Sequence, residues 1–446
     1  YRLRLGACVR WHGGLPTPAG RGVIRTPAGD RLARLVVIPA LRRTADPLVP
    51  QGESHDGKRG QSSFIVLLLA AVSASAGQTA ILAFLPTLVD PNPGGLSSAH
   101  DFHVASLTAV HPLAALVAAP LWGWIADRVD YRVMLRTALI ILAMVTAPVG
   151  LVALPTLYVL RTVAGMAAAA IIPLALLSAS FAAVSRGEQA RRFTWLTGSV
   201  FLGDLGGPLL AEASVAIMPG APLMIVAASI GTVAGSLCLV SLPGRCAHCL
   251  DSGDPPPPTV CATGVLLLIT IAAGAGLAAM HVNLLMTRSA VSLSREQIAW
   301  MLSLCGFGML AAQIFHARLD WLVKVPGRLA GLTLGLLAAA LVAFPLASSI
   351  ADMSVFILVA GWSSASLRLV TSFWISGSAA ASGVRLGLQH SAASIGQALA
   401  PVALAFAAPG AQPLVLWSIA GLSLLLLVVL PLAWKRPSSG ANSSGG

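Results

Sequence analysis

The chain has 446 residues, of which 56% are hydrophobic and only 10% are charged; its formal net charge is +12 and its mean hydropathy is +0.83. An ordinary soluble domain carries roughly 25% charged residues, so a soluble chain of this composition would expose apolar surface that water does not solvate. The composition therefore excludes a soluble globular protein and predicts that lipid is the solvent for most of the chain.

The first 61 residues differ from the rest because they contain 11 of the 28 lysines and arginines. Their longest apolar run, residues 35–41, is too short to span a membrane and contains Pro39. We expect residues 1–61 to be a disordered basic extension or upstream sequence joined to the protein, with an arginine-rich targeting peptide as the alternative.

Twelve apolar runs follow from Ser62 onward, each close to the roughly 20 residues that a membrane-spanning helix needs. The predicted spans are 62–89, 102–126, 134–154, 157–183, 193–217, 222–243, 261–286, 297–319, 329–348, 354–378, 387–408 and 413–434. Residues 244–260 separate six spans from six, and their proline run is incompatible with a helix. The predicted domains are a six-helix half at 62–243, a linker at 244–260, a second six-helix half at 261–434 and a tail at 435–446.

Basic residues divide unevenly between the loops at the two ends of the spans. The loops that follow spans 2, 4, 6, 8 and 10, together with the C-terminal tail, contain thirteen basic residues. They are Arg128, Arg132, Arg136, Arg186, Arg191, Arg192, Arg245, Arg318, Lys324, Arg328, Arg385, Lys435 and Arg436. The opposite loops contain only Arg288 and Arg295. Because basic loops stay in the cytoplasm, we expect a multi-pass protein of the cell inner (plasma) membrane with both termini cytoplasmic.

The loop after the second span contains the stretch GWIADRVDYR, residues 123–132. It resembles the signature of the major facilitator superfamily, which runs roughly Gly-x-Leu-Ala-Asp-Arg-x-Gly-Arg-Arg/Lys. The matching residues are Gly123, Ala126, Asp127, Arg128 and Arg132, whereas Asp130 and Tyr131 depart from the pattern. The resemblance implies an all-α integral membrane protein with twelve transmembrane helices in two six-helix halves, and a conformational latch at this loop.

Two further stretches share features with the same superfamily. Arg161 is followed by Gly165 in the fourth span, and Gly203, Gly207 and Pro208 fit a motif of the exporters in the fifth. Ala211 and Glu212 replace the closing glycine pair of that motif. The resemblance covers residues 62–436 and extends to the 12-span drug or metabolite:proton antiporter branch.

An internal repeat supports two related halves. At an offset of 193 residues, the matched pairs are Asp127 with Asp320, Arg192 with Arg385, Gly203 with Gly396, and Pro208 with Pro401. Parallel six-span repeats predict a substrate cavity between the halves near the middle of the membrane. The repeat also adds Asp320 to the predicted latch.

Prolines weaken the fifth and eleventh spans at matching points. Pro208 leaves the carbonyl of Asp204 without its helical partner, and Pro401 does the same to Gln397. Acids within the membrane are costly and usually functional. We therefore expect pliable gating helices built on Gly203, Gly207, Pro208, Gly396 and Pro401, with Asp204 as a protonatable group. The alternative is a packing kink that tolerates an acid.

Arg161 and Glu212 lie at similar depths near the outer ends of their spans, and Asp204 lies roughly 12 Å further in. We expect these three residues to form a proton-coupling set, in which Arg161 pairs with Glu212 or reaches Asp204. The alternatives are an arginine that snorkels to the interface and a glutamate that simply lies there.

Other polar residues within the spans are candidates for the substrate cavity. They are Gln78, His111, His281, Asn283, Arg368 and Gln397. Arg368 would meet an anionic substrate or pair across the cavity, and the histidines would relay protons or bind a ligand. The alternative for each histidine is a hydrogen-bonded packing role.

No cofactor or metal is expected. Cys246, His248 and Cys249 in the linker fall short of the four ligands of a structural zinc site, so we interpret them as reduced cytoplasmic residues. The chain contains no G-x-x-x-x-G-K-[ST] phosphate loop. The expected partners are a small-molecule substrate, protons and the lipid bilayer, without nucleic acid, and the protein is expected to function as a monomer.

These observations predict a transporter and not an enzyme. The first hypothesis is proton-coupled, multidrug-type efflux of a drug or metabolite by an alternating-access antiporter. The second is an uptake symporter or facilitator on the same scaffold. The third is a membrane sensor or assembly protein that does not transport.

Overall fold

The computed structural model describes residues 56–89, 98–183, 185–217, 223–238, 260–291, 293–319, 321–376, 382–407 and 410–433. Residues 1–57 and 58–446 form two units, and the description below concerns the second. The predicted basic extension up to residue 55, linker residues 244–259, tail residues 435–446 and the predicted latch residue Asp320 lie outside the described residues.

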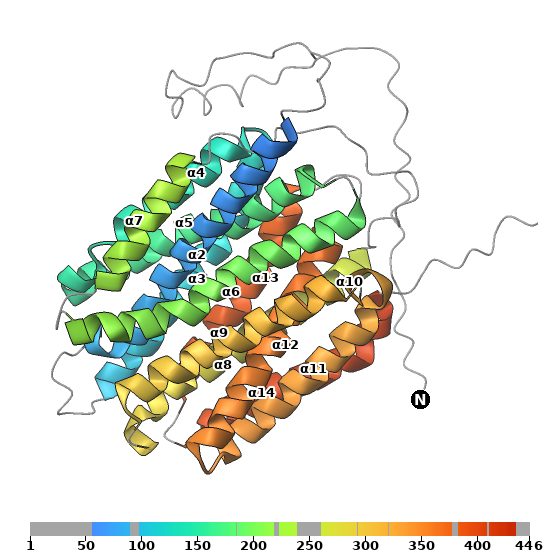
Figure 1. Ribbon diagram of the computed structural model, residues 1–446. Coiled ribbons are helices and arrows are strands. Elements are labelled where there is room, and N and C mark those ends of the chain that lie inside the picture. Colours follow the sequence, from blue (N-terminus) through green and yellow to red (C-terminus); the bar gives the residue numbers. More distant parts are fainter. Residues whose placement is uncertain are drawn as a thin grey trace, which may run out of the picture. The chain divides into compact units, whose positions relative to one another are not determined.

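Twelve long helices account for most of the described chain, and no β-strand occurs in it (Figure 1). The first six are α2 (Asp56–Val89), α3 (Ser98–Ala126), α4 (Tyr131–Thr146), α5 (Leu154–Phe181), α6 (Arg186–Ile217) and α7 (Leu223–Cys238). The second six are α8 (Val260–Val291), α9 (Arg295–Arg318), α11 (Pro326–Ala343), α12 (Ile350–Ser376), α13 (Gly383–Ala405) and α14 (Gln412–Val429). Each predicted span overlaps one of these helices, which confirms the predicted fold class.

Short elements complete the chain at the helix ends. They are α10 (Trp321–Lys324) and the 3-10 helices η2 (Val149–Leu151), η4 (Phe344–Leu346) and η5 (Leu430–Ala433). Nine of the described helices are long and apolar enough to cross a membrane. The chain is therefore an integral, multi-pass membrane protein.

Local sequence sets several helix boundaries. Asp130 caps α4 by accepting a 3.0 Å hydrogen bond from the backbone N–H of Arg132. Ser294 and Gln297 form a capping box at the start of α9. Pro155 lies in the first turn of α5, where its missing N–H costs nothing, so the break between the third and fourth spans falls just before the predicted one.

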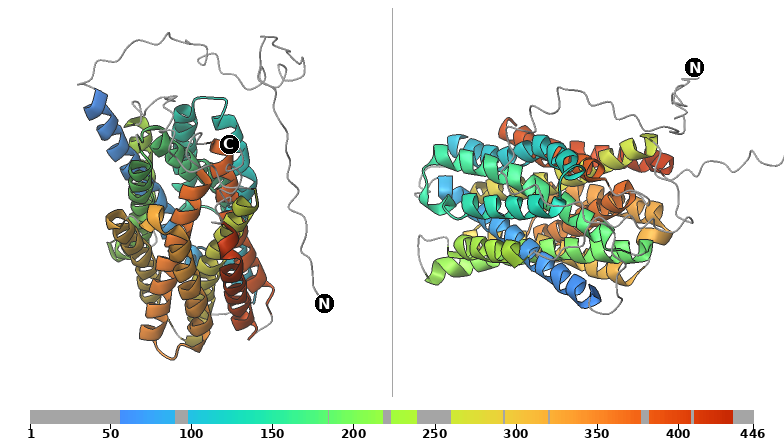
Figure 2. Two further views of the ribbon diagram at one scale, coloured as in Figure 1. Left: turned by 90° about the vertical axis from the view of Figure 1, so that its right-hand side faces the viewer. Right: turned by 90° about the horizontal axis from the view of Figure 1, so that it is seen from above.

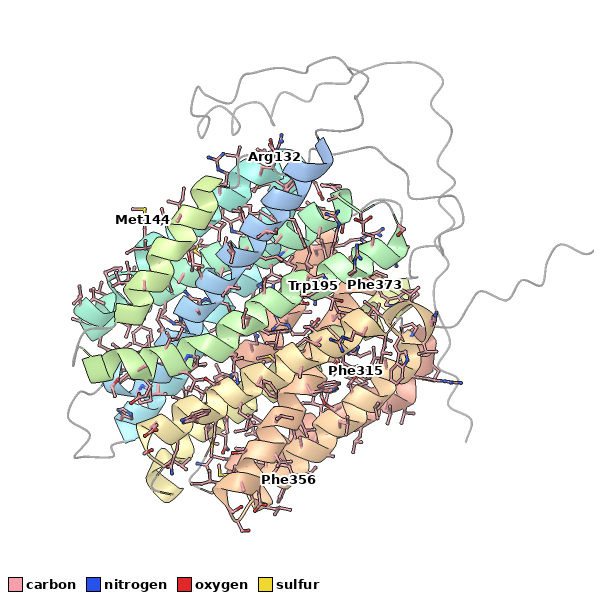
Figure 3. The ribbon with its side chains drawn as sticks, in the orientation of Figure 1. Arg132, Met144, Trp195, Phe315, Phe356 and Phe373 are labelled. Atoms are coloured by element: carbon pink, nitrogen blue, oxygen red, sulfur yellow. The ribbon has the colours of Figure 1, made fainter. Side chains whose placement is uncertain are left out.

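The long helices run side by side as one bundle in all three views (Figures 1 and 2). The two halves meet mainly where α3 packs against α13 and α6 packs against α9, and α5 also contacts α13. Buried leucine, alanine and isoleucine side chains fill the space between the helices. Large apolar side chains such as Met144 (69% exposed, Figure 3) and Val428 (75%) point outward, as expected for helices that face lipid.

Candidate functional site

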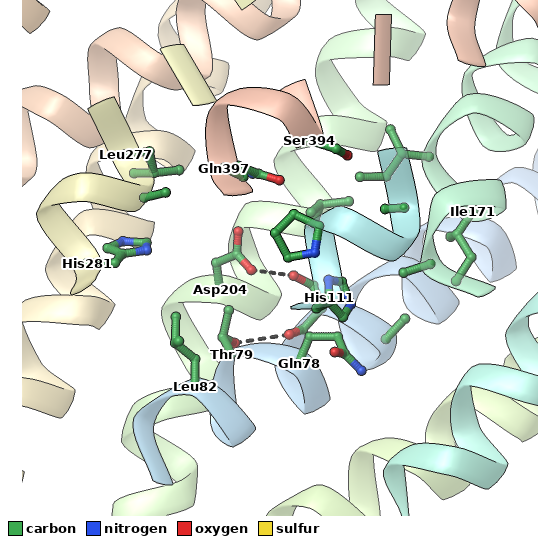
Figure 4. A pocket seen from close by; sticks show the side chains of 18 of the residues that line it. Gln78, Thr79, Leu82, His111, Ile171, Asp204, Leu277, His281, Ser394 and Gln397 are labelled. Atoms are coloured by element: carbon green, nitrogen blue, oxygen red, sulfur yellow. Dashed lines mark hydrogen bonds between the residues drawn. The ribbon is translucent and has the colours of Figure 1, made fainter. Parts of the chain in front are cut away.

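A cavity of about 270 Å³ lies between the two halves. Its walls come from α2, α3, α4, α5 and α6 of the first half and from α8, α9, α12 and α13 of the second. The predicted residues in its lining are Gln78, His111, Arg161, Asp204, Pro208, His281, Arg368 and Gln397. Figure 4 shows Asp204, His281 and Gln397 around it. Asn283 and Glu212 are not among the lining residues.

Asp204 on α6 is positioned by the glycines on either side of it. A Cβ atom at Gly203 would lie 2.8 Å from the side chain of Ser75 and the backbone N of Ala76, so glycine allows α6 to lie directly on α2. Gly207 makes the same kind of contact one turn later. This approach brings the hydroxyl of Ser75 to Asp204, to which it donates a hydrogen bond (Figure 4).

The turn that carries Asp204 also touches the second half. A Cβ atom at Gly306 of α9 would lie 2.5 Å from the backbone N of Leu205 and 2.8 Å from the carbonyl carbon of Asp204. Arg368 on α12 interacts electrostatically with Asp204, without a direct ion pair among the described residues. The cavity carboxyl therefore lies where the two halves cross.

The predicted repeat has a structural counterpart. Gly396 on α13 lies against α8, where an added Cβ would be 2.6 Å from the backbone N of Ala275. Gly274 of α8 lies close to the same helix, since its Cβ would be 2.5 Å from the carbonyl oxygen of Ala393. The α13–α8 crossing thus reproduces the α6–α2 crossing, and Gln397 takes the place of Asp204 in the cavity wall.

Arg161 on α5 points into the cavity and not toward Glu212. Its side chain is only 5% exposed, and its Nη1 donates a 3.0 Å hydrogen bond to Oε1 of Gln78. Gln78 in turn donates a 3.1 Å hydrogen bond to Oγ1 of Thr146. The predicted ion pair of Arg161 with Glu212 does not form within the described chain. Arg161 and Glu212 are predicted to pair because they lie at similar depths in the membrane, but depth does not fix the direction of a side chain. Glu212 is turned by about 80° around α6 relative to Asp204, which faces the cavity.

Arg161, His111, His390 and Arg368 form a row in the cavity lining, within electrostatic range of one another but without hydrogen bonds between these four described side chains. Gly165 lets α5 lie on the backbone of His111, and His111 interacts electrostatically with Arg161 and with His390. His390 on α13 interacts with Arg368. The Nε2 atoms of His111 and His281 have no hydrogen-bond partner among the described residues.

Four small polar residues of the cavity were not predicted from the sequence: Ser75, Thr79, Thr108 and Ser394. A serine or threonine in a helix usually bonds to its own backbone, as Thr108 does with the carbonyl of Val104. Such residues give no sequence signal when they turn toward a cavity. Ser75 would have been found only by knowing that Gly203 faces α2.

At one end of the bundle the α3–α4 loop reaches into the second half. Asp127 accepts hydrogen bonds from the Ser382 hydroxyl (3.0 Å) and from the backbone N–H groups of Gly383 (2.8 Å) and Val384 (3.3 Å). These donors surround the N-terminus of α13, where a negative charge is favoured. Asp127 therefore joins the two halves directly, as a latch residue would.

Arg128, Asp130 and Arg132 of the same loop contact residues of their own half. Arg128 lies 3.9 Å from the ring centroid of Trp124, and Arg132 forms a 2.7 Å ion pair with Asp130 at the start of α4. Tyr131, which departs from the family signature, is buried against Phe181. Another side-chain contact between the halves was not predicted: the Arg186 guanidinium lies 4.1 Å from the ring centroid of Phe373.

Gly123 and Gly383 allow the close crossing beside Asp127. A Cβ atom at Gly383 would lie 2.6 Å from the carbonyl oxygen of Gly123, and one at Gly123 would lie 2.6 Å from the carbonyl carbon of Gly383. We expect Gly123→Ala to lower the free energy of unfolding by about 1–3 kcal/mol, because backbone must move to admit the methyl group. Thermal unfolding of the purified protein measures this loss.

Gly335→Ala on α11 is the matched control, since a Cβ there meets nothing within 4 Å. It should keep or slightly raise the unfolding temperature, because alanine favours a helix over glycine by about 0.5–1 kcal/mol. If both variants unfold at the same temperature, the close approach of α3 and α13 at Gly123 does not require glycine.

Comparisons with known proteins agree with this geometry. Residues 67–286 match the sequence model of the Major Facilitator Superfamily. The crystal structure of the human organic anion transporter MFSD10 (TETRAN) aligns with a TM-score of 0.67 at 16% identity, covering 85% of this chain and 100% of that one. The proton:xylose symporter XylE, bound to 6-bromo-6-deoxy-D-glucose, aligns with a TM-score of 0.64 at 13% identity, covering 85% and 96%. No curated protein matches the chain in sequence.

Two six-helix halves around a polar cavity are the architecture of membrane transporters that are built from internal repeats. Residues 67–286, just under half of the chain, are similar in sequence to the Major Facilitator Superfamily, and the fold is similar to that of the two solved transporters.

Proposed function

We propose that the protein moves a small organic solute across the membrane by alternating access, with Asp204 as the site of a coupled proton. The observation that carries this proposal is the position of Asp204. It is the single carboxyl among the described residues of the cavity lining, and its turn touches both halves through Ser75 and Gly306. Its charge therefore acts at the contact that alternating access must rearrange.

In the proposed cycle, ionised Asp204 on α6 attracts Arg368 on α12 across the cavity. Protonation removes this attraction between the halves while the Ser75 hydrogen bond can persist. At the end of the bundle that carries the α3–α4 loop, opening requires Asp127 to leave the N-terminus of α13. Proton binding at the centre and latch release at the end are thus two steps of one conformational change.

Gln78, Arg161 and His111 belong to the solute site in this proposal. Arg161 and Gln78 are already held to each other, and Thr146 fixes the far side of Gln78. The row that continues through His111 and His390 leads to Arg368 in the other half. A solute bound along this row would contact both halves and stabilise the occluded state.

Export in exchange for protons is a second candidate, favoured by one observation. Gly203 and Gly207 bring α6 onto α2 at the glycine–proline pattern that resembles the family's exporters. In an exchanger, the solute and the proton compete for the same site. The related structures leave the mode of coupling open, because one is an organic anion transporter and the other is a proton:xylose symporter.

The membrane orientation belongs to the same proposal. Basic residues are concentrated in the loop that contains Asp127 and in the other loops at the same end of the spans. This asymmetry supports a latch and termini on the cytoplasmic side of the plasma membrane. We also propose that the protein functions as a monomer.

Reconstitution into proteoliposomes tests the proposal. A pH-sensitive dye inside the vesicles should report proton movement when a transported solute from a small compound library is added. Protein-free vesicles are the control. If no solute moves protons, and solute flux is indifferent to a pH gradient, the proposed coupling is wrong.

A further inference from the structure

The cavity contains more fixed positive than negative charge. Its described lining includes Arg161 from the first half, Arg368 from the second and a single acid, Asp204. Neither arginine forms a direct ion pair with Asp204 in the described part of the chain. Two guanidinium groups and one carboxylate leave an uncompensated positive charge in a site surrounded by apolar helices.

The donors of Arg161 are largely unused. A guanidinium has five N–H donors, and Arg161 makes one hydrogen bond to a described residue, to Gln78. Its Nε has no partner among these residues, although the side chain is 95% buried. Because a buried charged donor without an acceptor is costly, this arrangement calls for an acceptor that enters the cavity.

The guanidinium of Arg368 is a second group with unused hydrogen-bond donors among the described residues. Its guanidinium makes no hydrogen bond to a described residue, and its electrostatic partners are Asp204 and His390. The same side chain lines the main cavity and an adjoining one of about 40 Å³. Planar guanidinium groups bind carboxylates through two parallel hydrogen bonds, which a lysine or histidine does not reproduce.

We propose that the transported solute is an organic anion whose carboxylate binds between Arg161 and Arg368. This inference rests on the proposed transport function and names its substrate class. The apolar body of the solute would pack against the remaining walls of the cavity, which Leu82, Ile172 and Leu277 help to form. A volume of about 270 Å³ fits a small aromatic or aliphatic acid.

The same geometry decides how the anion and the proton are coupled. The groups that act on Asp204 from neighbouring helices are Ser75 on α2, Cys305 on α9 and Arg368 on α12. An anion bound to Arg368 offsets the positive charge that favours ionised Asp204, so it promotes protonation. By reciprocity, protonated Asp204 promotes anion binding. Anion and proton then move in the same direction, which favours co-transport over exchange.

A series of solutes that differ in charge but not in shape tests the site. Benzoate, benzamide and benzamidine form one such series, and 2-naphthoate, 2-naphthamide and 2-naphthamidine form a larger one. Binding to the purified full chain is measured by calorimetry and by the shift in thermal unfolding. The acids should bind, and the amides and amidines should bind at least tenfold more weakly.

Variants at three positions assign the binding to the proposed groups. Arg368→Gln should weaken acid binding at least tenfold, and Arg368→Lys should retain a preference for the acid at reduced affinity. Asp204→Asn should tighten acid binding several-fold, because it removes the competing negative charge. Arg328→Gln, at an exposed arginine on α11, is the control and should leave acid binding unchanged.

The outcomes separate this inference from the proposed function. The anion site is wrong if amides or amidines bind as tightly as the acids, if no acid binds, or if Asp204→Asn weakens acid binding. Solute-driven proton movement would still support transport in those cases. Conversely, acid binding that depends on Arg368, in a protein that moves no protons, would support the anion site and reject the proposed coupling.

Discussion

Asp204→Asn should abolish uphill, proton-driven transport while downhill exchange of solute continues. Asparagine keeps the size of the side chain and an oxygen that accepts the Ser75 hydrogen bond. It removes the negative charge and the site for a proton. The attraction to Arg368 across the cavity is then permanently absent, as it is in the protonated state of the wild-type protein.

Proteoliposomes with an imposed pH gradient measure this difference. The wild-type protein should concentrate solute, and the asparagine variant should only equilibrate it. Glu296→Gln, at an exposed acid in the first turn of α9, is a matched control that should concentrate solute normally. If the Asp204 variant still concentrates solute, the residue is an acid tolerated in a packing kink.

Asp127→Asn should shift the conformational equilibrium toward opening at the latch end. The carboxylate accepts three hydrogen bonds at the N-terminus of α13, and the amide has only one acceptor oxygen and no charge. Hydrogen bonds to charged groups contribute about 1.5–3 kcal/mol each. Losing about 1.4 kcal/mol of latch energy changes the closed-to-open ratio by about tenfold. Expression and solute binding should change little, and the transport rate should fall.

Distances between spin labels at Val129→Cys and Arg385→Cys report this opening, because both positions are exposed beside the latch. The asparagine variant should populate longer distances than the wild-type background. Asp130→Asn in the same loop is the control, since Asp130 pairs with Arg132 of its own half. Unchanged distances together with full transport in the Asp127 variant would mean that the loop charges only set topology.

Hydropathy predicted all twelve long helices, because lipid requires runs of about 20 apolar residues whatever their tertiary contacts. Of the repeat positions singled out in the fifth and eleventh spans, Asp204, Pro208 and Gln397 line the cavity, whereas Pro401 is not among the lining residues. Such residues are informative in a membrane span because few purely structural roles tolerate them.

Pairings between helices were harder to predict than positions along them. Depth alone suggested Arg161 with Glu212, whereas Arg161 binds Gln78, which faces it from α2. The loop signature did not distinguish Asp127, which crosses between the halves, from Arg132, which pairs within its own half. The Arg186–Phe373 contact joins residues far apart in the chain, and no local pattern predicts such a contact.

At Gly306, α9 approaches the backbone of α6 next to Asp204. If α6 rotates relative to α9 about this close contact, Asp204 lies near the axis of rotation. From Asp204 to the start of α6 at Arg186, the helix extends about 27 Å, so each degree of rotation moves that end by about 0.5 Å. The Asp204 turn itself is hardly displaced. A small rotation between α6 and α9 thus displaces the helix ends far more than the turn that contains Asp204. In the proposed cycle, the gain or loss of one proton at Asp204 would therefore accompany ångström-scale movement at the end of α6.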